Sequence, residues 1–324
     1  DAWSDTNPGS GSAWNVKGSD AYNSAGTTQY EQGATGFEIS AGQLGETLNG
    51  TGPTKYTDQV PAGVTYDRKF SAQAFLDRYL DNDMPFGFFL PNDGYGAGYG
   101  QNGYNVTGGV NADGSSTAER LEAVALNVAN LKVFADYAAS RGIATGLWTH
   151  SNLTPDSDPK TKWHLLRDFE SEVKAGVTTL KTDVAWVGPG YSFQLGGVKQ
   201  AYDIITTMDY DDNRSNTRPN IISLDGWAGS QRYNSVWSGD QTGGSWEYIR
   251  FHIPTFIGQS LSGNPNIGSD MDGIWGGSPV IATRDYQWKS FAPQMLDMDG
   301  WGSYVKGPFT HGDPYTGVSR MYLK

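Results

Sequence analysis

Residues 219–240, PNIISLDGWAGSQRYNSVWSGD, carry a short apolar run that leads into a loop rich in glycine and aromatic residues. The run Asn220–Leu224 has the length and composition of a buried strand, and a turn follows it at once. The stretch ends on Trp237-Ser238-Gly239-Asp240, where a carboxylate stands close to an aromatic ring. Aromatic faces cover the apolar side of a pyranose, and carboxylates accept hydrogen bonds from its hydroxyls. We interpret the stretch as a buried strand followed by a sugar-binding loop; the alternative is a loop whose Trp residues fill the core and whose Asp residues cap turns.

Strands and helices alternate along the chain on both sides of this stretch. Ser71 is a suitable helix N-cap, Pro85 ends the first helix, and Gly142 and Gly176 end two later ones. We predict strands over 86–90, 143–148, 177–182, 220–224, 266–269 and 295–298. We predict helices from 71 towards Pro85, over 118–140, 163–175, 198–208, 246–259 with an interruption near Pro254, over 285–291, and starting within 319–324.

This alternation predicts a parallel sheet built from βαβ units. About six of the eight units of a TIM (β/α)8 barrel can be placed in the sequence. We therefore expect an α/β fold, with a TIM-barrel catalytic domain over residues 66–324 whose first strand and last helix lie outside this fragment. An open doubly wound sheet is the alternative, and it is disfavoured because no glycine-rich dinucleotide turn follows a strand.

Residues 1–65 are rich in Gly, Ser, Thr and Asn and show no strong helical periodicity. Only Gly36–Ser40 has the character of a short strand. Interspersed aromatic residues, among them Trp3 and Trp14, favour partial packing over a disordered linker. We expect this segment to be an elaborated loop region that borders the functional site.

The composition limits the kinds of partner. The 324 residues carry a formal net charge of −12, from 35 acidic and 23 basic side chains, and this balance disfavours nucleic acid. Aromatic residues make up 13% of the chain, which suits contact with a carbohydrate. There is no cysteine, so disulfides and thiolate metal sites are excluded. We expect an oligosaccharide or glycan as the substrate.

No run of residues approaches the ~18 consecutive apolar positions of a membrane-spanning helix. Asp1 opens a polar stretch, and no signal peptide is present. We expect a piece of a longer bacterial protein, secreted or at the cell surface, with flanking domains and no membrane span.

Aspartates recur where predicted strands end. The carboxyl ends of parallel barrel strands meet at the face that holds the active site. A single Asp is often a turn former or a cap, but several at one face indicate a sugar site, because each carboxylate can accept hydrogen bonds from two adjacent hydroxyls. These residues are Asp93, Asp183, Asp225, Asp240, Asp270 with Asp272, and Asp297 with Asp299.

Cleavage of a glycoside needs two carboxyl groups in different protonation states. Lys181 lies two positions before Asp183, and its cation would lower the pKa of Asp183 and keep it nucleophilic. Asp240 lies near Trp237 and Asp225; apolar surroundings and a like charge would raise its pKa, as a general acid requires. The alternative for Lys181 and Asp183 is an ordinary buried ion pair.

Other kinds of site are disfavoured. The histidines His150, His164, His252 and His311 show no zinc spacing, and neither a G-x-S-x-G motif nor a P-loop is present. The run Asp270-Met271-Asp272-Gly273 matches only a small part of a calcium loop. We expect neither a metal nor a cofactor.

Residues 226–277, which run from GWAGSQRY through WSGD to SDMDGIWGG, resemble glycoside hydrolase family 31, the retaining α-glycosidases. The resemblance extends over about Pro85 to Trp301. It implies that Asp240, in the W-x-G-D motif, is the general acid/base. It also implies that Asp183, in LKTDVAW at the end of barrel strand four, is the nucleophile.

The chain departs from the α-glucosidases of this family at two places. Those enzymes carry an arginine where this chain has Leu224 or Asp225, and R-N-H on the last strand where it has residues 296–301. In the family both groups hold glucose hydroxyls in the −1 subsite. The segments LKTDVAWVG, SLDGWAGSQRY and SDMDGI look most like the branch that contains bacterial α-N-acetylgalactosaminidases.

The resemblance therefore implies a retaining hydrolase of terminal α-linked sugar, with α-N-acetylgalactosamine as the predicted sugar. One alternative is an α-glucosidase or α-transglucosylase acting on α-glucans or cycloalternan-type oligosaccharides, and another is a non-catalytic carbohydrate-binding barrel. Besides Asp183 and Asp240, the residues that we expect to bind substrate are Asp93, Trp148, Lys181, Trp186, Asp225, Trp227, Arg232, Trp237, Asp270 and Asp299.

Overall fold

The computed structural model describes residues 76, 79–90, 118, 131–132, 134–149, 169–182, 190–207, 218–224, 226–298, 307–309 and 311–324. The predicted loop region 1–65 lies outside these residues. Five of the predicted site residues also lie outside them, namely Asp93, Asp183, Trp186, Asp225 and Asp299. Trp148 is described only as a strand residue.

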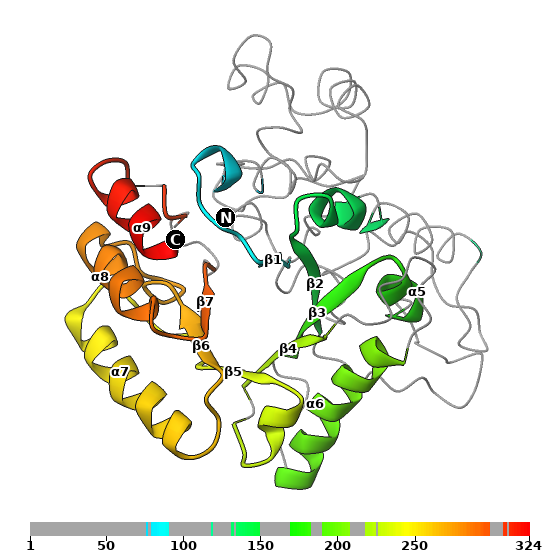
Figure 1. The fold of residues 1–324 in the computed structure, drawn as a ribbon. Helices are drawn as coiled ribbons and strands as arrows, with labels where there is room; N and C mark the ends of the chain where they lie inside the picture. Colours follow the sequence, from blue (N-terminus) through cyan, green and yellow to red (C-terminus); the bar gives the residue numbers. More distant parts are fainter. Residues whose placement is uncertain are drawn as a thin grey trace, which may run out of the picture.

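Seven parallel strands form one sheet in which the spatial order follows the chain order (Figure 1). They are β1 (Phe88–Phe89), β2 (Ala144–Thr149), β3 (Val177–Thr182), β4 (Asn220–Ser223), β5 (Ser235–Trp237), β6 (Ile267–Asp270) and β7 (Gln294–Leu296). The sheet curls around an axis with the helices outside it, as in part of a TIM barrel. The predicted barrel fold is thereby confirmed.

Strand β5 is the one strand of this sheet that the sequence pattern did not predict; the other strand ends agree to within two residues. It has three residues, Ser235, Val236 and Trp237, and was interpreted as part of the loop. Its pairing makes it a strand, because Ile222 of β4 pairs with Ser235 and Ile267 of β6 pairs with Val236. A strand this short carries no period of its own.

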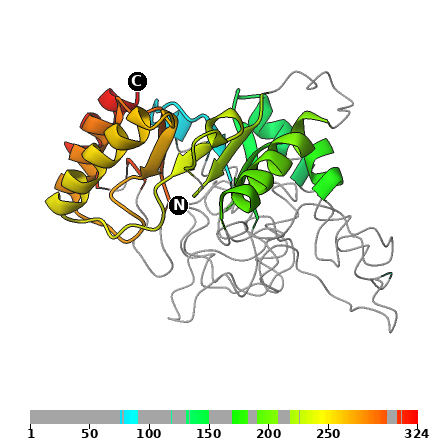
Figure 2. The same ribbon diagram turned by 90° about the horizontal axis from the view of Figure 1, so that it is seen from below.

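Helices cover the outer side of the sheet (Figure 2). They are α5 (Phe169–Lys174), α6 (Tyr191–Thr206), α7 (Trp246–Leu261), α8 (Pro279–Lys289) and α9 (Tyr315–Leu323), with the 3-10 helix η3 (Ser230–Arg232) before β5. Residues 79–81 and 134–139 are also helical. Three helices begin earlier than predicted: α6 contains the pair Gly196-Gly197, α8 is capped by Ser278, and α9 begins at Tyr315. None of the described helices is long and apolar enough to cross a membrane.

The predicted interruption of α7 near Pro254 is wrong, because the helix continues through this residue. Proline has no N–H, so the Arg250 carbonyl cannot receive its usual bond from position 254. Both Arg250 and Pro254 lie on the exposed side of α7, where water can solvate that carbonyl. The cost of the proline is therefore low enough for packing of the other side to hold the helix together.

The two faces of the sheet have different roles. On the outer face, Val236 and Ile267 pack against Phe256 of α7. On the inner face, Ile222, Trp237 and Leu296 form a second buried cluster. Side chains therefore alternate between the helix layer and the barrel interior, as the pleat of a strand requires.

Contacts join the C-terminal helix to the segment that leads into β1, at the two ends of the sheet (Figure 1). Arg320 of α9 donates a 2.5 Å hydrogen bond from Nε to the Asn82 carbonyl, and Lys324 pairs with Asp83. These contacts connect α9 to the segment before β1, and β1 and β7 are the two edge strands of the sheet.

Candidate active site

The carboxyl ends of the strands lie along one edge of the curled sheet. In the parallel register Thr182 pairs with Ser223, Trp237 with Gly268, and Asp270 with Leu296. Asp240 follows Trp237 by three positions and Asp183 follows Thr182 directly in the sequence. The structure thus brings the Asp240 loop and Asp270 to the same edge, whereas convergence of Asp183 on this edge stays a prediction.

Trp237 joins two charged groups inside the barrel, and only 2% of its surface is exposed. Its indole Nε1 donates a 2.9 Å hydrogen bond to Asp270 Oδ2. The Lys181 ammonium lies over the ring, 3.6 Å from its centroid. Lys181 and Asp270 are equally buried. One aromatic ring therefore orients a cation from β3 and a carboxylate from β6.

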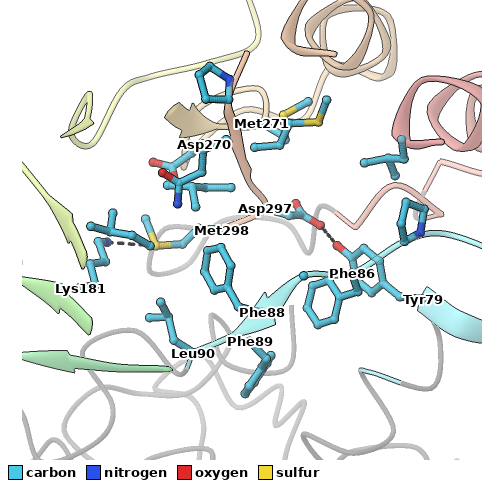
Figure 3. Close-up of a pocket in the computed structure, with 18 of the residues that line it drawn as sticks. Tyr79, Phe86, Phe88, Phe89, Leu90, Lys181, Asp270, Met271, Asp297 and Met298 are labelled. Carbon is cyan, nitrogen blue, oxygen red and sulfur yellow. Dashed lines mark hydrogen bonds between the residues drawn. The ribbon is translucent and has the colours of Figure 1, made fainter. Parts of the chain in front are cut away.

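A cavity of about 420 Å³ opens next to this group, between β1 and β7. Figure 3 shows Lys181 and Asp270 on one side of it and Phe86, Phe88 and Leu90 along the β1 side. Its size is within the range of roughly 300–1,000 Å³ that is usual for small-molecule sites. Mostly apolar walls with a few charged groups suit a ligand with both an apolar and a polar face, such as a sugar ring.

Asp297 adds a third charged side chain to this cavity (Figure 3). It directly follows β7 and accepts a hydrogen bond from the Tyr79 hydroxyl. The Tyr79 ring stacks on Phe86, with 4.4 Å between the ring centroids. The contact connects the end of β7 to the segment before β1 at the wall of the cavity.

Asp240 is exposed on the loop that follows β5. Gly239 before it has φ 91°, a conformation that glycine adopts at no steric cost. Gln241 after it donates a 2.9 Å hydrogen bond from Nε2 to the Ser238 carbonyl. The backbone on both sides of Asp240 is therefore constrained, but the residue is exposed to solvent and does not lie in the apolar surroundings that were expected to raise its pKa.

Buried His252 of α7 holds Ser238, the residue that opens this loop. Its Nδ1 lies 3.0 Å from the Tyr248 carbonyl, which can only accept, so Nδ1 carries the proton. Nε2 then accepts from the Ser238 hydroxyl at 3.1 Å. Burial lowers the pKa of His252 to about 4, so the ring is neutral at pH 7.

A second polar network lies behind β6. The fully buried Lys289 ammonium donates to Asp285 Oδ2 at 2.5 Å, to the Tyr248 hydroxyl at 2.8 Å and to the Asp270 carbonyl at 2.7 Å. Trp288 Nε1 donates to the other Asp285 oxygen at 2.6 Å. Burial, assisted by the Asp285 charge, raises the pKa of the Tyr248 hydroxyl. The network fixes the backbone of Asp270 from outside the barrel.

Two further predicted site residues lie between β4 and β5. Trp227 is about half exposed, and its indole donates to Gln194 of α6. Arg232 lines a separate cavity together with Pro219, at the start of β4, and Gln294, at the start of β7. The structure does not bring Arg232 to the edge that holds Asp240, because the chain must return to the amino ends of the strands before β5 can run parallel to β4.

Several residues of the site were not predicted from the sequence. The aromatic wall from Tyr79 to Phe88 and the supporting pair Asp285 and Lys289 are examples. The sequence did contain a signal for this pair. An Asp and a Lys four residues apart lie on the same side of a helix, and the other residues on that side of α8 are buried. In the part of the chain that the structure describes, no three metal-binding side chains come together.

A curled parallel sheet with carboxylates at its carboxyl edge and a cavity beside them is the architecture of a (β/α)-barrel enzyme. The family model described as the Glycosyl hydrolases family 31 TIM-barrel domain matches residues 128–324, more than half of the chain. The chain therefore belongs to glycosyl hydrolase family 31.

Its relatives include enzymes with different printed activities. The chain is 33% identical over 148 residues to an alpha-xylosidase of Saccharolobus solfataricus, which covers 43% of this chain and 19% of that protein. It is 29% identical over 113 residues to neutral alpha-glucosidase C of Mus musculus, which covers 35% of this chain and 12% of that protein. The matches thus span less than a fifth of either relative.

Solved structures show the same fold. The cycloalternan-forming enzyme from Listeria monocytogenes, in complex with a pentasaccharide substrate, is similar with a TM-score of 0.56 at 16% identity. That likeness covers 77% of this chain and 30% of the Listeria chain. A family 31 alpha-glucosidase from Bacteroides thetaiotaomicron is similar with a TM-score of 0.52 at 16% identity, over 78% of this chain and 47% of that one.

Proposed function

We propose that this barrel cleaves terminal α-glycosides with retention of anomeric configuration, and that its substrate is an α-glucoside or an α-xyloside. The observation that carries the proposal is the position of the Asp240 loop and Asp270 at one edge of the sheet, together with the cavity that Asp270 and Lys181 line. Family membership supports glycoside hydrolysis as the reaction.

The proposed reaction has two steps. First, the Asp183 carboxylate attacks the anomeric carbon, the bond to the leaving oxygen breaks, and Asp240 gives that oxygen its proton. Then Asp240, now a carboxylate, takes a proton from water, whose oxygen attacks the anomeric carbon and releases Asp183. The buried Lys181 cation, two residues before Asp183 in the chain, supports an ionised nucleophile.

The sugar is proposed from the relatives, which include an alpha-xylosidase and alpha-glucosidases. A second candidate is α-N-acetylgalactosamine, because one residue departs from the pattern of the family's glucosidases. Leu224, at the position where the family's glucosidases carry an arginine or next to it, packs on the cluster of Ile222, Trp237 and Leu296. An aliphatic side chain cannot hold a glucose hydroxyl as a guanidinium does.

A panel of p-nitrophenyl α-glycosides (glucose, xylose, galactose, N-acetylglucosamine and N-acetylgalactosamine) tests the proposal. We expect release of p-nitrophenol from the glucoside or the xyloside, and its loss in Asp183→Asn. Turnover confined to the N-acetylgalactosaminide would select the second candidate. Binding of these sugars without turnover of any of them would indicate a non-catalytic carbohydrate-binding barrel.

A further inference from the structure

Asp272 is a fully buried carboxylate in the turn that follows β6, two residues beyond Asp270. Its φ is 56°, in the left-handed region that few residues other than glycine and asparagine or aspartate adopt. A buried charge in an unfavourable backbone conformation persists only where its surroundings compensate for both costs. The contacts of Asp272 show what those surroundings are.

Both carboxylate oxygens of Asp272 accept hydrogen bonds from backbone N–H groups of two different loops. Oδ1 accepts from the Gly244 N–H at 2.6 Å, in the loop that follows Asp240. Oδ2 accepts from the N–H groups of Gly277 and Ser278, at 2.8 and 3.1 Å, in the loop before α8. One carboxylate therefore joins the loop after β5 to the loop after β6.

The two loops have the same local sequence, Gly-Gly-Ser, and each serine caps a helix. Ser245 caps α7 and Ser278 caps α8, with their side chains accepting from the N–H groups of Tyr248 and Ile281. Asp272 thus lies at the amino ends of two helices, where the helix dipoles favour a negative charge. This arrangement compensates for burial of the carboxylate.

Glycines let the loops approach Asp272 closely. A Cβ atom at Gly243 or at Gly276 would overlap the Asp272 carbonyl oxygen. The Ile274 N–H also donates a 2.9 Å hydrogen bond to the Gln241 carbonyl, directly after Asp240. The segment 241–244 is consequently held against the turn 272–277 with no room for a side chain between them.

The turn itself is fixed to the buried network behind β6. The Asp272 N–H donates a 2.7 Å hydrogen bond to Asp285 Oδ2, the oxygen that Lys289 also contacts. A continuous set of contacts therefore leads from the buried Lys289 cation through Asp285 and Asp272 to the loop that carries Asp240.

We infer that Asp272 is a positioning residue for Asp240: it holds the loop after β5 at the distance from the sugar site that proton transfer to the leaving oxygen requires. The inference rests on the proposed function in that Asp240 is taken as the acid/base. It adds a residue that does not touch the substrate but determines where the acid stands.

The test compares Asp272→Asn with wild type in the full chain. An amide keeps the shape but replaces one acceptor oxygen by a donor, which opposes the N–H groups of Gly244 or of Gly277 and Ser278. Asp136→Asn, at an exposed helix position, is the matched control. Hydrogen exchange of residues 238–245 is measured, together with kcat/KM on an α-glycosyl fluoride and on the methyl α-glycoside of the same sugar.

We expect faster exchange at residues 238–245 in Asp272→Asn and a loss of about 100-fold or more on the methyl glycoside, whose leaving group needs an acid. The fluoride departs without protonation and should be affected far less, and the basic limb of the pH profile should change only for the methyl glycoside. Unchanged exchange, or equal losses on both substrates, would overturn the inference.

Two further outcomes are separated by the same design. If wild type turns over no α-glycoside, the proposed function fails, and the exchange measurement alone decides whether Asp272 fixes the loop. If Asp272→Asn does not fold, hydrogen exchange in wild type decides. The N–H groups of Gly244, Gly277 and Ser278 should then exchange through one common opening, because the same carboxylate holds all three. Independent opening of these groups would contradict the inference that Asp272 holds the two loops together.

Discussion

The Lys181 ammonium and the Trp237 ring form a buried cation–π contact, with 3.6 Å between Nζ and the ring centroid. The same indole donates to Asp270 at its edge, so the ring presents its negative face to the cation and its N–H to the anion. Neither charge can rotate away without breaking a contact with the ring. The uncharged Trp237 side chain therefore fixes the positions of two charged groups that line the cavity.

Replacing Trp237 with Phe should destabilise the protein by about 1–3 kcal/mol, because the ring stays but Asp270 Oδ2 loses its buried donor. Urea denaturation followed by circular dichroism measures the change. Trp246→Phe is the control, since Trp246 is half exposed at the start of α7, and its midpoint should stay near that of wild type. Equal effects of the two substitutions would show that the Nε1 bond adds nothing.

Replacing Lys289 with Met should cost about 3–5 kcal/mol, because the Asp285 charge is left buried without its cation. Adding Asp285→Asn to the Lys289→Met variant should restore part of the lost stability, because it removes the charge that has no cation beside it. The denaturation midpoints of the two variants make the comparison. Lys132→Met, which breaks an exposed pair with Asp136, should leave the midpoint almost unchanged, so a large effect there would point to a general loss of positive charge.

Acid should destabilise the fold through His252. In the unfolded chain this imidazole takes a proton near pH 6.5, whereas in the folded protein it does so only at about pH 4. Between these values the unfolded state binds more protons, so the stabilisation present above pH 6.5 is lost as the pH falls towards 4. From pH 7 to pH 5 the contribution should be roughly 1–2 kcal/mol.

His252→Gln isolates the contribution of His252 to the pH dependence of stability, because glutamine cannot be protonated in that range. Urea denaturation should show that the free energy of unfolding falls less between pH 7 and pH 5 in the variant than in wild type. The same acid loss in both proteins would assign the pH dependence to other groups.

Azide should distinguish the roles of the two aspartates. Asp183→Ala should lose turnover and regain it with azide, giving the β-glycosyl azide, because azide attacks from the face that the nucleophile vacates. Asp240→Ala should keep the first step on substrates with good leaving groups and give the α-glycosyl azide. NMR of the first-formed sugar from wild type is the direct check: release of the β-anomer would mean that Asp183 is not a nucleophile.

The sequence pattern located the strands whose hydrophobic runs are long enough to be read, such as Val177–Thr182, which is a strand over those same residues. It missed β5 because three residues carry no period, and their pairing with β4 and β6 is a long-range event. That omission also explains why Arg232 was predicted to bind substrate, whereas η3, which contains it, lies where the chain returns to the amino ends of the strands.

The roles of Asp272 and His252 were beyond prediction for another reason, and Asp272 was expected among the aspartates of the sugar site although it is fully buried. Asp272 accepts hydrogen bonds from backbone groups that are distant in sequence, such as the Gly244 N–H, and His252 contacts the hydroxyl of Ser238, which lies on another element. Nothing in the local sequence distinguishes an aspartate that accepts such long-range bonds from one that forms an ordinary turn. Only the packed structure distinguishes the two.

The glycine contacts around Asp272 limit how this barrel can be re-engineered or diversified. A chimaera that takes the loop after β5 from a relative, with any side chain at position 243, would place it against the Asp272 backbone unless the turn after β6 came from the same donor. Loop grafting here therefore has to exchange both segments together. Variation in substrate range within such a lineage should arise by paired changes in these loops, or elsewhere around the mouth of the barrel.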